Sequence, residues 1–440
     1  MTTCLRLLCL AVLGVLCTAV FGSAAPMAIG VQLTATTALI MGGTGHPLIG
    51  ESAEFVGEYV SGALDRYIAP TGPARAEPAD PGLYNVVVVQ TPEQFWPVDG
   101  ADLFDTSVAI GVDNLTNCLH GRTSCKAERF GDDTVSSPDY TVFGYSQSAR
   151  IATIVKRDLI AKSADPDLHV SFVLISNPNR PNGGILERFA GLHIPGLGVT
   201  FDGATPTDSC DTDGTDCRFP TADITWQYDG WADFPRRPLN LLADLNALAG
   251  IGYLHPNYTV AVTDAMYQGS TGDTAYYLIP TARLPLLMPL AQLGVPGPIL
   301  DVLDAPLRVI IEWGYDRGVN PGDPTPATLA DRGDPVTKVR NLLEAIHTGL
   351  DDGLQEAGFG RPLGTRPAGT FGVGVTPLPT ASPNVPAPAA GQPSTRPAGA
   401  AGLKPRTRPR LGRPPHGYVG AHGQVDHRNI VGHGRSGRGR

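Results

Sequence analysis

The stretch "YTVFGYSQSAR", residues 140–150, places a serine where a buried strand gives way to a helix. Residues 140–143 are β-branched and aromatic, which is typical of a strand, and apolar residues recur at helical spacing from Ile151 onward. Ser146 therefore lies in a sharp strand-to-helix turn, beside the small residue Gly144. This geometry, a nucleophile elbow, predicts an exposed and strained hydroxyl at the carboxyl end of a sheet. A serine that only caps the helix is the alternative interpretation.

Uninterrupted apolar runs before and after this turn predict further buried strands. They lie at residues 37–41, 83–90, 169–175 and 222–226. Strands without polar alternation are covered on both faces, as in parallel sheets. Helical patterns separate these runs, at about residues 50–66, 148–164 and 238–250. The alternation predicts the α/β class, and with the elbow it predicts an α/β-hydrolase fold, a mainly parallel sheet flanked by helices.

The region after the predicted sheet is apolar and rich in proline. Residues 274–305 contain repeated prolines, which predict short apolar pieces and exclude one long helix. These pieces form either a cap region over the site or ordinary packing onto the sheet. The run "LRVIIEWGYD", residues 307–316, is interpreted as a final strand, and residues 334–358 as an amphipathic helix that closes the fold.

Composition divides the chain into three parts. Residues 1–28 combine one early positive charge with an apolar run and small residues, which predicts a signal peptide or an N-terminal membrane anchor. Residues 35–360 form the predicted hydrolase domain. Residues 361–440 are rich in proline, glycine and arginine and predict a disordered basic tail. We therefore expect an exported protein of the cell envelope, either membrane-anchored or secreted.

The charge of the chain is distributed unevenly. Residues 361–440 hold 12 Lys and Arg and one acidic residue, whereas residues 1–360 hold 21 basic and 41 acidic residues. An acidic body argues against a nucleic acid partner, because phosphate contacts need positive charge.

Four cysteines beyond the predicted export segment form two local pairs. Six residues separate Cys118 from Cys125, and six separate Cys210 from Cys217. In an exported protein this spacing predicts two small disulfide loops. Metal binding is the alternative, but the spacing differs from that of zinc sites. We expect neither a metal nor a cofactor.

A nucleophilic serine needs a base and an acid that orients the base. In this architecture the acid follows a later strand and the histidine comes after the acid. Asp229 and Asp233 follow the predicted strand at residues 222–226, and His255 follows the next helix. The predicted triad is Ser146, Asp229 and His255, with Asp233 as the alternative acid.

Acyl transfer also needs hydrogen-bond donors for the developing oxyanion. The backbone N–H of Gln147, directly after the nucleophile, is one candidate. The glycine-rich loop after the first strand offers the second donor, and within Gly43 to Gly45 the most favoured residue is Thr44. The loop lacks the lysine of a phosphate-binding loop and is an incomplete dinucleotide motif.

Several longer motifs occur in a familiar order: "MGGTGHPL" at 41–48, "FGYSQSARIA" at 143–152 and "YDGWADFPRRPL" at 228–239. With them the chain resembles the PE-PPE C-terminal domain family over roughly residues 35–320. This mycobacterial-type group of serine α/β-hydrolases is related to cutinases and lipases. The resemblance implies Ser146 as nucleophile and His255 as base, and leaves Asp229 and Asp233 open. The segment before the domain does not match the family's proline- and glutamate-rich modules. This difference implies that the chain is similar to the family's stand-alone, envelope-associated members. Some of these members act as acyltransferases on trehalose-type glycolipids.

The expected activity is that of an exported serine esterase or lipase, which cleaves acyl esters through an acyl-enzyme intermediate. An acyltransferase on trehalose-type glycolipids is one alternative, because water and a sugar hydroxyl can resolve the same intermediate. An inactive scaffold of the envelope is the other. The expected partners are an acyl ester or glycolipid substrate, and a membrane through the N-terminal segment.

Overall fold

A computed structural model describes residues 36–72, 84–130, 139–162, 168–210, 217–330 and 333–375. The predicted leader at residues 1–28 and the chain from residue 376 onward lie outside the described residues, so the predictions made for them stay predictions. Within the described ranges, no helix is both long and apolar enough to cross a membrane.

The centre of the fold is an eight-stranded sheet with the order β3-β2-β1-β4-β5-β8-β10-β9. Its strands are β1 (Thr36–Ile40), β2 (Tyr84–Val89), β3 (Ala127–Phe130), β4 (Asp139–Tyr145), β5 (His169–Ile175), β8 (Thr221–Trp226), β9 (Met266–Thr271) and β10 (Thr274–Ile279). The six inner strands are parallel, and the edge strands β3 and β9 are antiparallel to their neighbours. The predicted α/β-hydrolase class is confirmed.

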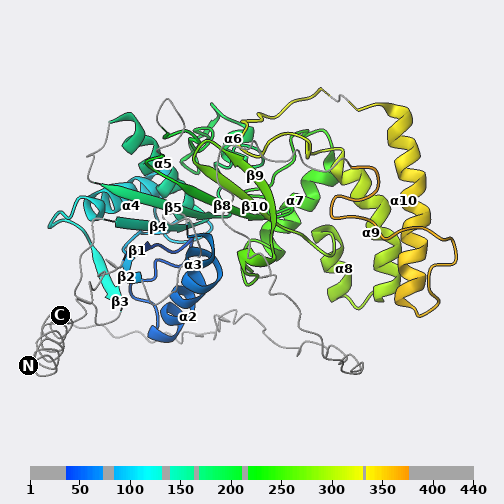
Figure 1. The fold of residues 1–440 in the computed structure, drawn as a ribbon, viewed down its shortest axis with the longest axis horizontal. Coiled ribbons are helices and arrows are strands. Elements are labelled where there is room, and N and C mark those ends of the chain that lie inside the picture. The colour runs from blue at the N-terminus through cyan, green and yellow to red at the C-terminus, as the bar shows by residue number, and fades with distance from the viewer. Residues whose placement is uncertain are drawn as a thin grey trace, which may run out of the picture. The chain divides into compact units, whose positions relative to one another are not determined.

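Helices cover both faces of the sheet, with α4 and α5 on one side and α2 and α3 on the other (Figure 1). The helices of the described residues are α2 (Ala53–Ala63), α3 (Ala69–Thr71), α4 (Phe104–Leu119), α5 (Gln147–Ala161), α6 (Ile185–Arg188), α7 (Leu241–Tyr253), α8 (Met288–Gln292), α9 (Gly297–Glu312) and α10 (Pro335–Glu356). A π-helical turn (Leu64–Ile68), two 3₁₀ turns (Val262–Asp264, Pro285–Leu287) and a small hairpin of β6 (His193–Ile194) and β7 (Val199–Thr200) complete the elements.

Neighbouring residues of β1, β2, β4 and β5 enter opposite halves of the core. Leu39 packs into the cluster beneath α4 and α5, and Ile40 into the cluster beneath α2. Val142 and Phe143 divide in the same way. This two-sided burial explains why the strands read as uninterrupted apolar runs.

The proline-rich region packs against α7. Leu284, Leu287 and Leu300 join Ala243 of α7 in a third apolar cluster. The expected short pieces are present at Pro285–Leu287 and α8, but the following residues form α9. The predicted strand at residues 307–316 is wrong, because α9 continues to Glu312 with Pro306 inside it. Pro306 has no backbone N–H, so α9 loses one hydrogen bond. Packing in the third apolar cluster offsets this loss, because Leu300 and Ile311 of α9 contribute to it.

The folded part extends beyond the predicted boundary at Gly360. Thr370 accepts a hydrogen bond of 2.9 Å from Gln227 Nε2. Phe371 is buried, and the guanidinium of Arg317 lies 5.2 Å from the centre of its ring. Residues 361–375, which composition assigns to the tail, are thus part of the domain, because a few well-placed contacts outweigh a turn-rich composition.

Both predicted disulfides are confirmed, Cys118 with Cys125 and Cys210 with Cys217. The first closes the connection between α4 and β3. A buried ion pair links the helix α5 to the turn before β10, with Lys156 Nζ 2.7 Å from Asp273 Oδ1. Burial lowers the pKa of Lys156, while Asp273 favours its charged form. The pair fixes α5 against the far strands of the sheet.

Candidate active site

The order of the strands reverses between β1 and β4, the position where open α/β sheets bind ligands. From β1 the chain moves outward to β2 and β3, and it then returns to the other side of β1 to form β4. The loops after β1 and β4 therefore lie at the carboxyl edge of neighbouring strands. These loops carry the predicted oxyanion segment and Ser146.

Ser146 occupies the single residue between β4 and α5. Its backbone has φ 57° and ψ −113°, a conformation that residues with a side chain rarely adopt. Gly144 makes this turn possible, because a Cβ there would lie 2.6 Å from the carbonyl oxygen of Ser148. Ser148, which replaces the last glycine of the usual motif, accepts a 2.8 Å hydrogen bond from the N–H of Tyr145 through its Oγ. The turn is thus closed by a side chain where a glycine is the usual choice.

The structure brings Ser146, His255 and Asp229 together. Ser146 Oγ lies 2.8 Å from His255 Nε2, and His255 Nδ1 lies 3.1 Å from both carboxylate oxygens of Asp229. Asp229 lies in the connection from β8 to α7, and His255 lies in the connection that follows α7. Both ends of α7 therefore supply a residue to the site. This is the arrangement of a nucleophile, a base and the acid that orients the base.

Asp229 is fully buried and ionised. Burial opposes its charge, but His255 and the hydroxyls of Ser176 and Tyr258 outweigh this effect and lower the pKa of Asp229. A carboxylate can only accept, so the ring of His255 carries its hydrogen on Nδ1 and presents a bare Nε2 to the serine. Because the pKa is lowered on folding, the stability from this group is present above the ordinary aspartate pKa and is lost as pH falls through the lowered value.

Asp233, the alternative acid, has a different set of partners. Its carboxylate accepts two hydrogen bonds from Arg317, of 2.7 and 3.0 Å, and one of 2.7 Å from the N–H of Tyr228. Arg317 also bonds Glu312. Asp233 therefore anchors the turn that carries Asp229, from behind the site.

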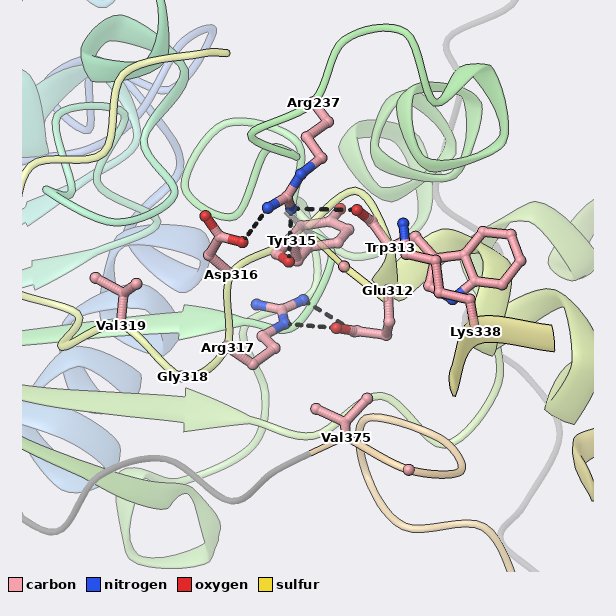
Figure 2. Close-up of a pocket in the computed structure, with 12 residues that line it drawn as sticks. Arg237, Glu312, Trp313, Tyr315, Asp316, Arg317, Gly318, Val319, Lys338 and Val375 are labelled. Carbon is pink, nitrogen blue, oxygen red and sulfur yellow. Dashed lines mark hydrogen bonds and ion pairs between the residues drawn. The ribbon is translucent and has the colours of Figure 1, made fainter. Parts of the chain in front are cut away.

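A cavity of about 410 Å³ lies beside this anchor, and its wall includes Arg317, Glu312 and Trp313. Figure 2 shows its charged side chains directed at one another, Arg317 at Glu312 and Arg237 at Asp316. Because these charges are already paired, we assign the cluster a structural role.

Two residues that sequence reasoning missed complete the triad. Ser176 Oγ lies 2.5 Å from Asp229 Oδ2 and 2.7 Å from His255 Nδ1. Tyr258 donates a 2.6 Å hydrogen bond to the same carboxylate oxygen. Burial and the neighbouring Asp229 raise the pKa of Tyr258, which keeps it a donor. Ser176 directly follows β5, which lies beside β4, the strand that leads to Ser146. A polar residue at the end of this strand is the sequence signal that could have indicated Ser176.

Tyr145 holds the loop of the base from the nucleophile strand. Its hydroxyl donates to the carbonyl oxygen of His255, and the two rings stack with their centres 5.3 Å apart. The residue before the nucleophile thus fixes both the backbone and the ring of the base.

The glycine-rich loop after β1 provides the predicted donors in part. Within the described ranges, the N–H groups of Thr44 and Gln147 make no hydrogen bond, which leaves both available to an oxyanion. The N–H of Gly45 is already used, because it donates to the carbonyl of Glu93 at 2.8 Å. Gly43 accepts from the N–H of His46 and closes the turn. Gln147 Nε2 lies 3.3 Å from Thr44 Oγ1, which joins the two halves of the predicted oxyanion hole.

No group of three or more His, Cys, Asp and Glu side chains in the described residues is suited to hold a metal ion. Among the described residues, the site offers the hydroxyl of Ser146, the imidazole of His255 and the backbone N–H groups of Thr44 and Gln147.

Comparison with known proteins adds a family pattern and named relatives. The pattern of the PE-PPE domain matches residues 81–316. "Esterase PE16" of Mycobacterium tuberculosis (strain ATCC 25618 / H37Rv) is 38% identical over 384 residues, which cover 78% of this chain and 66% of that protein. "PE family protein PE3" of the same strain is 37% identical and covers 73% of this chain and 63% of its own length.

A more distant relative carries a different activity in its name. "SL1278 acyltransferase Chp1" of the same strain is 31% identical over 257 residues, which cover 54% of this chain and 56% of that protein. The chain thus spans about two thirds or less of the length of these relatives. No solved structure matches the chain.

Proposed function

Because the chain belongs to the PE-PPE domain family, we propose that it is a serine esterase that cleaves acyl esters through an acyl-enzyme formed on Ser146. The observation that carries this proposal is the 2.8 Å contact between Ser146 Oγ and His255 Nε2, with Asp229 on the other ring nitrogen. The relative named an esterase gives independent support.

The proposed reaction proceeds in two halves. His255 Nε2 takes the proton of Ser146 as Oγ attacks the ester carbonyl carbon, and the imidazolium returns that proton to the departing alcohol. In the second half, an incoming hydroxyl gives its proton to Nε2 and attacks the acyl carbon. The bond between this carbon and Ser146 Oγ then breaks, and Nε2 returns the proton to Oγ. Asp229 stabilises the imidazolium in both halves. The free N–H groups of Thr44 and Gln147 are the proposed donors to the oxyanion.

The acceptor of the acyl group distinguishes two forms of this activity. Water as acceptor makes the protein an esterase, and a sugar hydroxyl makes it an acyltransferase. The relative named an acyltransferase supports the second form, at lower identity. A lipid-like substrate is supported by α7, the helix that leads to His255, whose Leu241, Leu245 and Leu248 are 69%, 52% and 55% exposed. Such contiguous apolar exposure is typical of surfaces that meet apolar partners.

A fluorophosphonate probe tests the nucleophile directly. We expect the wild-type protein to react with it and peptide mapping to place the adduct on Ser146, because only an activated serine attacks phosphorus at a useful rate. The Ser146→Ala variant should remain unlabelled, while Ser61→Ala, which removes an exposed hydroxyl of α2, is the control and should still react. A folded but unlabelled wild type would contradict the proposal. Product analysis with a trehalose glycolipid donor then separates transfer from hydrolysis.

We also propose that the protein works outside the cytoplasm. The two disulfides support this, because such bonds persist in oxidising compartments. Alkylation of the protein from its own cells without prior reduction should leave Cys118, Cys125, Cys210 and Cys217 unmodified, as read by mass spectrometry. Free thiols at these four positions would contradict the proposal.

A further inference from the structure

Glu93, in the loop after β2, is a carboxyl group without an evident structural partner. Its side chain is fully buried, and neither carboxyl oxygen has a hydrogen-bond partner among the described residues. Its backbone is also strained, with φ 51°. A buried carboxylate without a partner is strongly destabilising, so the group is expected to be neutral. A strained, desolvated glutamate at this position therefore needs an explanation.

The loop of Glu93 connects two parts of the candidate site. The carbonyl of Glu93 accepts the 2.8 Å hydrogen bond from Gly45, next to Thr44. The carbonyl of Gln94 accepts a 3.0 Å bond from Gln147 Nε2, on the residue after the nucleophile.

Helix α4 fixes the same loop from its outer side. The N–H of Gln94 donates to Ser107 Oγ at 3.0 Å, and this hydroxyl donates to Gln147 Oε1 at 2.8 Å. Residues 93 and 94 therefore hold both proposed oxyanion donors in register with each other.

We infer that Glu93 is a positioning residue, whose neutral buried carboxyl keeps this loop closed against the oxyanion segment. The inference rests on the proposed acyl-enzyme function. Glu93 acts through Gly45 and Gln147, and its carboxyl group itself touches no reacting atom. Loss of its proton would place an unpaired charge in the core, which the protein can hydrate only by opening the loop. Opening withdraws the Glu93 carbonyl from Gly45 and shifts Thr44 from the oxyanion.

The side chain of Thr91 favours a negative charge on Glu93, but burial outweighs this effect. The phenol of Tyr59 in α2 lies near the carboxyl; burial raises its pKa, so it stays neutral and supplies no positive charge. Among the described residues, Glu93 forms no ion pair, and His46 of the adjacent turn lies instead 3.5 Å from Glu51. Burial raises the pKa of Glu93 to about 8.

Because the pKa of Glu93 is raised in the folded protein, a rise in pH reduces stability. The folded-state pKa lies above the ordinary value of 4.5, so the stability that the neutral carboxyl contributes is full below that value and is lost as pH rises through about 8. In the folded enzyme the neutral fraction of Glu93 falls about tenfold between pH 7 and pH 9. Both kcat and kcat/KM should fall with it, since an oxyanion donor acts in the transition state.

The test is the pH profile of ester turnover between pH 7 and pH 9 in the full chain. We expect the wild type and the control Glu58→Gln, an exposed glutamate of α2, to lose about tenfold in kcat at the alkaline end. Glu93→Gln, which cannot ionise, should keep a flat profile there. A flat wild-type profile, or the same alkaline loss in Glu93→Gln, would overturn the inference.

Hydrogen exchange of the wild type covers the case in which Glu93→Gln does not fold. The amide of Gly45 should lose protection between pH 7 and pH 9, after correction for the intrinsic exchange rate, whereas the amide of Ile224 in the central sheet should not. Unchanged protection of Gly45 would overturn the inference. A wild type that hydrolyses no ester at any pH would refute the proposed function, and the exchange measurement would still decide the role of Glu93.

Discussion

Ester turnover by the His255→Ala variant is expected to fall by about a millionfold in kcat, since a serine hydroxyl without its base is a poor nucleophile. His255 Nε2 lies 2.8 Å from Ser146 Oγ, in position to take the proton as the bond to carbon forms. The substrate should still bind, so KM should change little. The measurement is steady-state kinetics on a soluble acyl ester, with circular dichroism to confirm the fold.

Two further variants make this expectation specific. His347→Ala removes an exposed imidazole from α10 and should leave the rate unchanged. The double variant Ser146→Ala/His255→Ala should be no slower than either single variant, because the two residues act as one unit. Additive losses, or a His255→Ala variant within tenfold of the wild type, would show that another residue is the base.

Asp229→Asn is expected to lower kcat by about 10⁴-fold while the fold is retained. Its carboxylate holds the hydrogen of His255 on Nδ1, at 3.1 Å, and an amide in its place can donate to that nitrogen and favour the wrong tautomer. Nε2 would then carry the hydrogen and could not accept from Ser146. The pH profile of kcat, measured with the same ester, tests the role of the negative charge.

Asp233→Asn is the matched control for the acid. Asp233 pairs with Arg317, so its loss should reduce the free energy of unfolding by about 3 to 5 kcal/mol and affect kcat far less than Asp229→Asn does. Denaturant unfolding of the two variants separates the effects. The reverse pattern, with the larger kinetic loss in Asp233→Asn, would assign the acid role to Asp233.

The sequence was sufficient for the features that depend on local pattern. The strand before Ser146, the turn and α5 follow from apolar spacing. Chain order after the nucleophile indicated His255 and, as the acid, Asp229 with Asp233 as the alternative. Local pattern failed where tertiary contacts decide. The apolar residues of α9 resemble a strand, yet they form a helix because the third apolar cluster, with α7, packs against their face.

The parts of the site that escaped prediction share one property. Ser176, Tyr258 and Glu93 act through partners that are distant in the chain, such as Ser176 with Asp229, so no short motif contains them. Their residue types are also ordinary in loops. Only the parallel register of β5 and β8 reveals that Ser176 and Asp229 leave adjacent strand ends.

That adjacency allows the acid a second position. The imidazole of His255 is reached from the ends of two neighbouring strands, by the hydroxyl of Ser176 and by the carboxylate of Asp229. Two substitutions, Ser176→Asp and Asp229→Ser, would therefore move the carboxylate to the neighbouring strand end, within reach of the same nitrogen of His255, while Ser146 and His255 keep their places.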